Sequence, residues 1–145
     1  MRAVIQRVKH GKVSVDNHTV AEINLGLVIL LGIGHGDDET KISYLADKIA
    51  SLRIFEDAQG KMNQSLLDVH GEALVVSQFT LYADTSKGRR PSFTDAALPD
   101  LARPLVEMFA MKLTNLGIPT QQGEFGAHML VEIDNDGPVT IILER

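Results

Sequence analysis

The chain has 145 residues, 44% of them hydrophobic and 23% charged, and contains no cysteine. This length and composition predict one globular domain over residues 1–145 that is soluble and compatible with the cytosol, and they exclude disulfides and thiolate chemistry. The net charge of −5 argues against broad nucleic-acid binding, although a local basic patch could still bind one RNA, and no signal peptide or membrane span is expected.

Strand patterns fill the first part of the chain. Residues 3–16 alternate between apolar and polar on both sides of His10 and Gly11, which predicts a hairpin with its turn at these two residues. The strand pattern continues over 18–23. The continuous apolar run over 25–33 predicts a central strand that is buried on both faces.

A glycine-punctuated loop precedes the first predicted helix. Asp37 and Asp38 can cap this helix, because a carboxylate accepts hydrogen bonds from free backbone N–H groups at a helix start. Apolar residues at helical spacing continue the helix to about Arg53. The following segment is loop-like, with a turn at Gln59 and Gly60.

A second buried strand is predicted over 72–81, followed by a long polar connection. A second helix is expected to start near Pro99 and to end at Gly117, since proline suits a first helical turn and glycine a helix end. Two closing strands are expected, roughly 128–133 and 139–143, joined by a hairpin turn. The elements together predict an α/β protein of α+β character, with mostly antiparallel strands and two main helices that cover one face.

Most common catalytic arrangements are missing from the sequence. The histidines form no HxH, HExxH or other metal-binding spacing, so no metal site and no cofactor are predicted. No phosphate-binding loop and no GxSxG elbow occur, whereas a dispersed Ser–His–Asp triad stays open because its members need not be adjacent. The five histidines, best interpreted as surface or loop residues, are His10, His18, His35, His70 and His128.

The second buried strand ends in the polar run SQFT. The hydroxyls of Ser77 and Thr80, together with the amide of Gln78, could meet at the rim of a pocket. The backbone N–H of Phe79 could there polarise a substrate carbonyl. Ordinary hydrogen bonding at a strand end explains the same residues, and on this segment alone it is the favoured interpretation.

Two further segments are unusual. KGRRPSF places Lys87, Arg89 and Arg90 on one loop of an acidic protein, where they could contact phosphates or simply face solvent. NDGPVT contains Gly137 and Pro138 at the start of a strand, where proline cannot donate to the ladder and its peptide bond can be cis. On turn chemistry alone, a plain hairpin is the favoured interpretation of the second segment.

Taken together, SQFTL, KGRRPSF and NDGPVT resemble the bacterial-type D-aminoacyl-tRNA deacylases. The similarity runs nearly end to end, through MRAVIQRV, GHGDDE, RIFED, GKMN and GEFGA. One position departs from the family, because His128 stands where its members often have an acidic residue. The resemblance implies a layered β/β/α fold and a cytoplasmic enzyme that needs no cofactor and no membrane.

The resemblance also implies a reaction and its site. The substrate would be the ester between a D-amino acid and the 3′-terminal adenosine of tRNA, with mischarged glycyl-tRNA also cleaved. The enzyme would be an obligate homodimer with active sites at the subunit interface. A cis Gly137-Pro138 bond of one subunit, held by Arg7, would enter the pocket lined by residues 77–80 of the other and reject L-amino acids. The alternatives are a general esterase and a non-catalytic RNA- or DNA-binding module that uses the basic loop.

Overall fold

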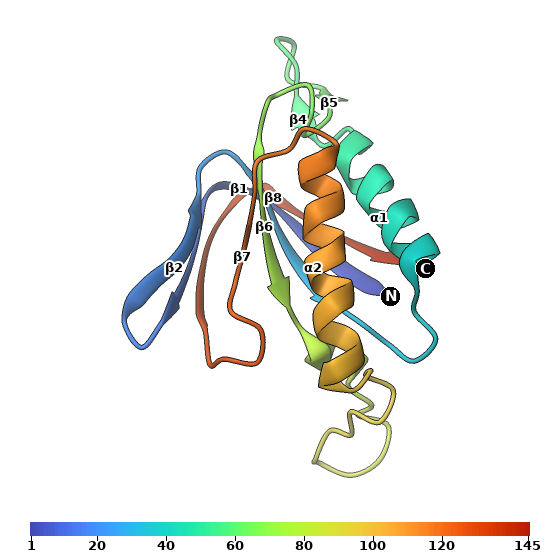
Figure 1. Cartoon of the computed structure of the whole chain (residues 1–145). Coiled ribbons are helices and arrows are strands. Elements are labelled where there is room, and N and C mark those ends of the chain that lie inside the picture. Colours follow the sequence, from blue (N-terminus) through green and yellow to red (C-terminus); the bar gives the residue numbers. More distant parts are fainter.

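The computed structural model describes residues 1–145, and a six-stranded mixed sheet forms its centre (Figure 1). A separate two-stranded sheet and two long helices complete the chain, together with one short 3₁₀ turn, η1. The elements of the large sheet are β1 (Arg2–Val15), β2 (His18–Ile23), β3 (Gly26–Gly32), β6 (Glu72–Ser77), β7 (Thr120–Gln122) and β8 (Leu130–Glu144). The others are α1 (Glu39–Ser51), β4 (Phe55–Glu56), β5 (Met62–Gln64), η1 (Phe79–Tyr82) and α2 (Pro99–Asn115).

Strand β1 organises the sheet. One edge of β1 pairs antiparallel with β3 along its first half and with β2 along its second half, while the other edge pairs antiparallel with β8. Beyond β3 the sheet continues through β6 and β7, and both of these pairings are parallel. Strand β8 pairs with no strand other than β1, so it forms an edge of the sheet.

The core has two parts, which define three layers. A cluster of 26 buried residues lies between the sheet and the two helices, which lie side by side over one face (Figure 1). A smaller cluster of 7 residues comes only from β1, β2, β3 and β6, and it includes Val13, Ile23 and Leu74. The outer half of β1 and β2 therefore fold over β3 and β6, which confirms the expected β/β/α layering and the α+β class.

The predicted hairpin at His10 and Gly11 is wrong. Strand β1 continues through these residues without a turn, although its pairing with β8 is irregular between Val8 and Gly11, and the turn to β2 lies at Asp16 and Asn17, which have φ angles of 48° and 64°. Glycine at position 11 serves packing instead, because a Cβ there would lie 2.7 Å from a methyl carbon of Val28. The alternating pattern correctly indicated a strand but placed its end too early.

The predicted closing hairpin is also wrong. Residues 130–144 form one strand, β8, and both of its halves pair with β1. Gln6 pairs with Thr140 and Val8 with Asn135, so β8 advances five positions while β1 advances two. The extra residues form a bulge, where a residue without an N–H does not interrupt the ladder.

The helices begin and end close to their predicted positions. Asp38 caps α1 by accepting a hydrogen bond from the N–H of Lys41 at 3.0 Å, whereas Asp37 has other partners. Helix α2 begins at Pro99, and Gly117 follows its end with a φ of 90°. Neither helix is both long and apolar enough to cross a membrane.

The remaining predictions were confirmed in part. The apolar run became β3, which is buried on both faces as expected. The second buried strand, β6, ends at Ser77, and η1 replaces the predicted continuation to residue 81. The short strands β4, β5 and β7 were not predicted, since two or three residues give too little pattern to detect.

Gly26→Ala is expected to lower the free energy of unfolding by about 3 kcal/mol or more, at the upper end of overpacking costs. A Cβ at Gly26 would lie 1.9 Å from the carbonyl oxygen of Glu72, which belongs to the neighbouring strand and cannot rotate away. Gly60→Ala is the control: it has a φ of 73° and no atom within 4 Å, so only about 1 kcal/mol of backbone strain is expected. Urea unfolding would measure both, and equal losses would contradict the prediction.

Candidate active site

A cavity of about 500 Å³ opens at the carboxyl end of β6. Its wall comes from Ile33 and from three stretches far apart in the sequence: the end of β6 with the start of η1, residues 93–102, and residues 125–131. Twelve of its 17 lining residues are hydrophobic, and Ser77, Gln78 and His128 supply polar groups. This size and this mixture of apolar wall and few polar groups are typical of small-molecule sites.

The SQFT run forms one side of this cavity. The N–H of Gln78 makes the last ladder bond, to the carbonyl of Leu31 at 2.8 Å, and the chain then turns into η1. The first bond of this turn runs from the N–H of Leu81 to the carbonyl of Gln78 at 3.3 Å. The N–H groups of Phe79 and Thr80 precede that bond, so they have no partner within the turn and can donate to a ligand.

The predicted polar side chains are not equivalent in the structure. Ser77, Gln78 and Phe79 line the cavity, whereas Thr80 does not. The hydroxyl of Thr80 instead accepts a hydrogen bond from the side-chain amide of Gln78. Thr80 thus lies beside a side chain of the cavity wall rather than in the wall itself.

Aromatic rings form much of the apolar wall. Phe79 is 56% exposed and packs edge-on against Phe93, with ring centroids 5.0 Å apart. Phe125 also lines the cavity, and the guanidinium of Arg103 lies 4.7 Å from its ring centre. Sequence reasoning did not assign Phe93, Phe125 or His128 to a site, and the aromatic residue inside the glycine-containing segment GEFGA was the only available signal.

Gly137 and Pro138 occupy the bulge of β8, and both are exposed. The peptide bond between them is cis, and Gly137 has a φ of 122°. The side chain of Asn135 ties the bulge together, because its oxygen accepts from the N–H of Val139 at 2.9 Å and its amide donates to the hydroxyl of Thr140 at 3.2 Å.

Arg7, on the neighbouring strand β1, contacts the same bulge through Asp136. Its side chain is buried, and its guanidinium donates to the carbonyl oxygens of Ile54 at 2.7 Å and Asp136 at 3.1 Å. It also forms an ion pair with the carboxylate of Asp136 at 3.3 Å. The structure thus places Arg7 beside Asp136, the residue that precedes Gly137.

One chain does not bring the cavity and the bulge together. Arg7 pairs with Leu27 on β3, whereas Ser77 pairs with Leu31, four residues further along the same strand. Four residues of strand span roughly 13 Å. Neither Gly137 nor Pro138 is among the residues that line the cavity.

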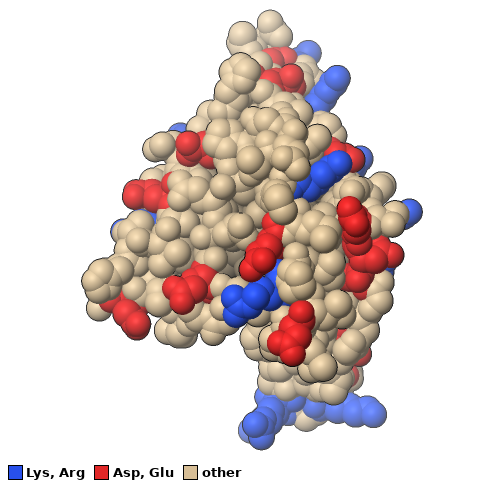
Figure 2. Space-filling model, viewed as in Figure 1, with Lys and Arg blue, Asp and Glu red and all other residues tan.

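The three basic residues Lys87, Arg89 and Arg90 are exposed on the loop between η1 and α2. Figure 2 shows Lys and Arg side chains gathered at the end of the molecule where this loop lies. A bridge between Asp84 and Ser92 closes the base of the loop, directly before the cavity residue Phe93. The loop therefore starts and ends near the cavity mouth, and its cations face solvent.

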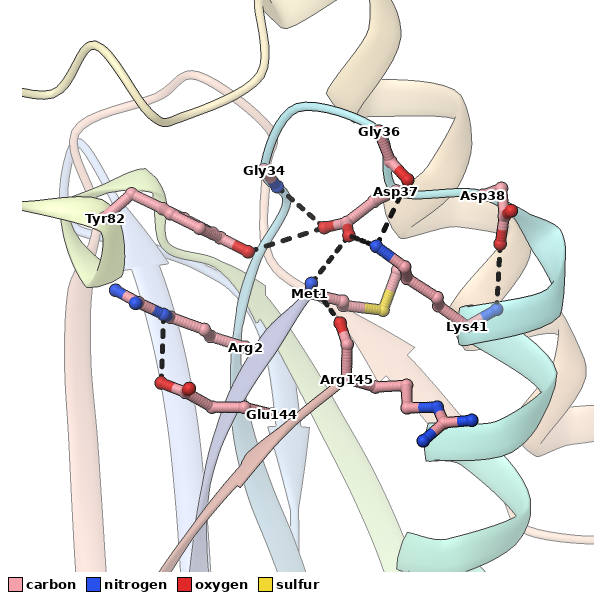
Figure 3. A network of polar contacts seen from close by, with 10 residues as sticks. All are labelled: Met1, Arg2, Gly34, Gly36, Asp37, Asp38, Lys41, Tyr82, Glu144 and Arg145. Carbon is pink, nitrogen blue, oxygen red and sulfur yellow. Dashed lines mark hydrogen bonds and ion pairs between the residues drawn. The ribbon is translucent and has the colours of Figure 1, made fainter.

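A polar network centred on the buried Asp37 adjoins the end of η1 at Tyr82 (Figure 3). Asp37 accepts hydrogen bonds from the Met1 ammonium at 2.6 Å, the N–H of Gly34 at 2.7 Å and the ammonium of Lys41 at 2.9 Å. Burial alone would raise the pKa of Asp37, but these donors hold it below its usual 3.8. Burial, together with the nearby Asp37 carboxylate, raises the pKa of Tyr82 to about 12. The network is thus charged at Asp37 and neutral at Tyr82 near neutral pH.

The chain resembles proteins of one family over nearly its whole length. The family model described as D-Tyr-tRNA(Tyr) deacylase matches residues 4–144. A D-aminoacyl-tRNA deacylase of Roseiflexus castenholzii is 60% identical over 144 residues, which are 99% of this chain and 92% of that protein. A D-aminoacyl-tRNA deacylase of Clostridioides difficile is 56% identical, over 99% of this chain and 97% of its own length.

Two solved structures share the fold. One, described as c-Myc DNA Unwinding Element Binding Protein, has a TM-score of 0.94 and 40% identity, and the match covers 100% of this chain and 99% of that one. The other, described as a probable eukaryotic D-amino acid tRNA deacylase, has a TM-score of 0.81 over 98% of this chain and 97% of its own. At 18% identity, the second likeness concerns the fold alone.

Proposed function

The chain belongs to the D-Tyr-tRNA(Tyr) deacylase family, and on this basis we propose that it is a hydrolase that cleaves the ester of D-aminoacyl-tRNA to a free amino acid and tRNA in the cytoplasm. The observation that carries the proposal is the cavity at the end of β6, which combines aromatic walls with the backbone N–H of Phe79, a donor that has no partner within η1. Aromatic faces suit the terminal base of a single-stranded nucleic-acid end. Unpaired N–H groups suit a carbonyl that becomes an oxyanion.

The chemistry required is modest. An aminoacyl ester is already activated, so positioning and polarisation of its carbonyl can supply the acceleration. Water adds to the carbonyl carbon, the N–H of Phe79 donates to the developing oxyanion, and the terminal ribose leaves as its alcohol. The ribose hydroxyl beside the ester takes part in this step, so that no side-chain nucleophile is needed. The position of Thr80 outside the cavity supports this scheme.

A homodimer would complete the site. Since Gly137 and Pro138 lie far from the cavity of their own chain, we propose that they enter the cavity of a second chain. The free edge of the sheet supports such an assembly, because β8 pairs only with β1 and carries the exposed side chains of Leu130 and Ile142. An unpaired edge with outward apolar residues is suited to contact another copy.

Chiral selection follows from this arrangement. If the carbonyl oxygens of Gly137 and Pro138 hold the α-amino group of the substrate while its ester carbonyl lies at Phe79, the direction of the side chain on the substrate Cα is fixed. A D side chain then points to solvent, whereas an L side chain collides with the Gly137-Pro138 turn. Rejection by collision does not depend on the identity of the side chain. Many D-amino acids, and glycine, are therefore expected as substrates.

Hydrolysis of D-tyrosyl-tRNA and L-tyrosyl-tRNA by the purified protein is the decisive experiment. Rapid loss of the D ester alone is the expected result. Loss of both esters would leave a hydrolase but contradict rejection by collision. Loss of neither, with a folded protein, would contradict the proposed enzyme. Turnover of small esters that carry no RNA would point instead to a general esterase.

A nucleic-acid-binding function without catalysis is the second candidate. It is favoured by the exposed basic loop and by the 40% identical structure described as a DNA unwinding element binding protein. The acidic net charge of −5 speaks against a strong general binder. Binding of tRNA or duplex DNA with no ester hydrolysis would support this candidate over the enzyme.

Replacing Lys87, Arg89 and Arg90 together by alanine is expected to weaken tRNA binding about tenfold or more. The slope of log K against log salt concentration should fall by the equivalent of about two to three phosphate contacts. The reason is that each exposed cation on the loop can neutralise one phosphate. Lys61→Ala is the control, because the β4–β5 hairpin lies at the opposite end of the molecule (Figure 1). Unchanged affinity and unchanged salt dependence in the triple variant would remove the loop from the site.

A further inference from the structure

The α-amino group of Met1 is buried and donates hydrogen bonds to two acceptors within the fold. Its nitrogen lies 2.6 Å from a carboxylate oxygen of Asp37 and 2.8 Å from the carbonyl oxygen of Arg145. The side chains of Met1 and Asp37 are 0% and 1% exposed. A chain terminus usually lies in solvent and is poorly ordered unless something ties it down. A buried charge that has an equally buried partner is therefore a specific feature of this fold.

The same carboxylate connects the terminus to the cavity. The second oxygen of Asp37 accepts from the N–H of Gly34 at 2.7 Å and lies 3.5 Å from the hydroxyl of Tyr82 (Figure 3). Gly34 and Tyr82 are in close contact, since a Cβ at Gly34 would lie 2.6 Å from the hydroxyl oxygen of Tyr82. Tyr82 is the last residue of η1, whose first residue, Phe79, lines the cavity.

Arg2 holds the same turn from the other side. Its guanidinium donates to the carbonyl of Leu81 at 2.8 Å and lies 4.6 Å from the ring centre of Tyr82. Its guanidinium also forms an exposed ion pair with Glu144 at 3.0 Å. Arg2 thus contacts the last two residues of η1 directly, and Met1 reaches Tyr82 through Asp37, while Phe79 at the start of η1 carries the N–H at the cavity.

We propose that the free α-ammonium of Met1 is a positioning group for the active site, and that a formyl or acetyl group on this nitrogen lowers activity by loosening η1. The expected loss of activity rests on the proposed function, whereas the expected loosening of η1 does not. Nothing in the proposed reaction uses Met1 or Asp37 directly, so their effect would be transmitted through Gly34 and Tyr82.

The chemistry of acylation explains the expected effect. An ammonium has three N–H donors and a positive charge, whereas an acylated nitrogen keeps one N–H and is neutral. The acyl carbonyl would also need room and a donor in a place where Met1 and Asp37 are almost without exposure. Asp37 would be left with the partly exposed Lys41 as its only cation. Removal of one partner from a buried ion pair is among the costlier changes in proteins.

The experiment compares the full chain with a free Met1 amine, the same chain acetylated on that nitrogen, and Asp37→Asn with and without acetylation. Asp38→Asn is the matched control, because Asp38 is the adjacent carboxylate, is exposed, and asparagine caps helices equally well. The readouts are Tm, hydrogen exchange at the N–H groups of Leu81 and Ala83, and hydrolysis of D-tyrosyl-tRNA. These two N–H groups bond to carbonyls of Gln78 and Thr80, so they report on η1 itself.

Acetylation is expected to lower Tm by about 10 °C, given the cost of breaking a buried pair in a chain of this size. Exchange at Leu81 and Ala83 should become faster, and kcat should fall by about tenfold or more through misplacement of the turn. Asp37→Asn should act in the same direction. Acetylation of that variant should add little, because both changes remove the same ion pair between Met1 and Asp37. Asp38→Asn should match the unmodified protein.

Unchanged exchange at Leu81 and Ala83 in the acetylated chain would overturn the inference, whatever happens to Tm. A lower Tm with full activity and full protection of η1 would mean that the ammonium supports the fold but does not position the site. If no variant hydrolyses the D ester, the unmodified protein included, the proposed function fails. In that case the exchange data still decide whether acylation of Met1 loosens η1.

Discussion

Arg7→Ala is expected to lower the free energy of unfolding by about 3–5 kcal/mol, because it removes a buried guanidinium and leaves two carbonyl acceptors without a donor. Arg7 is 4% exposed, and its guanidinium satisfies the carbonyl oxygens of Ile54 and Asp136. Alanine would leave these acceptors without a donor inside the protein. Urea unfolding with matched far-UV spectra would measure the loss.

Lys9→Ala provides the control for this change. Lys9 pairs with the same carboxylate, that of Asp136 at 3.4 Å, but its side chain is 75% exposed. An exposed ion pair contributes little, so we expect a change within about 0.5 kcal/mol. Arg7→Lys keeps the charge but loses the planar fork, and it should reduce hydrolysis while the protein stays folded. Equal effects of Arg7→Ala and Lys9→Ala would show that burial of the guanidinium does not matter.

Phe79→Pro is expected to lower kcat for D-aminoacyl-tRNA by a further factor of about 10²–10³ relative to Phe79→Ala, as is typical for loss of one oxyanion donor. Both variants remove the aromatic ring, but only proline removes the backbone N–H. Proline fits the position because residue 79 begins a 3₁₀ turn and Gln78 before it lies outside the α region, with φ −140° and ψ 80°. Single-turnover hydrolysis of D-tyrosyl-tRNA would measure the difference.

Thr80→Val tests the rival mechanism in which the threonine hydroxyl is the nucleophile. The hydroxyl accepts a bond from Gln78 and Thr80 does not line the cavity, so most activity should remain. A loss on the order of a thousandfold would instead identify an essential catalytic group. Equal rates for Phe79→Pro and Phe79→Ala would remove the N–H of Phe79 from the mechanism.

The sequence predicted the strands and helices better than their ends. Alternation around Gly11 correctly indicated a strand, but glycine is common both in turns and where strands pack closely. The segment with Gly137 and Pro138 has turn chemistry, yet the chain continues along β1 because both flanking halves find partners on that long strand. Local pattern cannot reveal such a partner, since the pairing joins opposite ends of the chain.

The candidate site could be found only in part for a similar reason. Ser77 and Gln78 attract notice because polar side chains are costly at the end of a buried strand. Phe93, Phe125 and His128 give no such signal, because only the fold brings residues 93–102 and residues 125–131 to the end of β6. The separation of Gly137 and Pro138 from their own cavity likewise depends on strand register, which the sequence pattern does not define.

The distance between the cavity and the bulge of β8 within one chain also predicts complementation between two differently altered chains. In a dimer whose sites each combine the cavity of one chain with Gly137 and Pro138 of the other, a chain altered at Phe79 and a chain altered at Arg7 carry defects in different halves of a site. After random exchange of subunits, half of the dimers are mixed, and one of the two sites in each mixed dimer has two intact halves. Two inactive proteins would therefore regain about a quarter of the sites on mixing, whereas a single chain that carries both alterations could rescue neither.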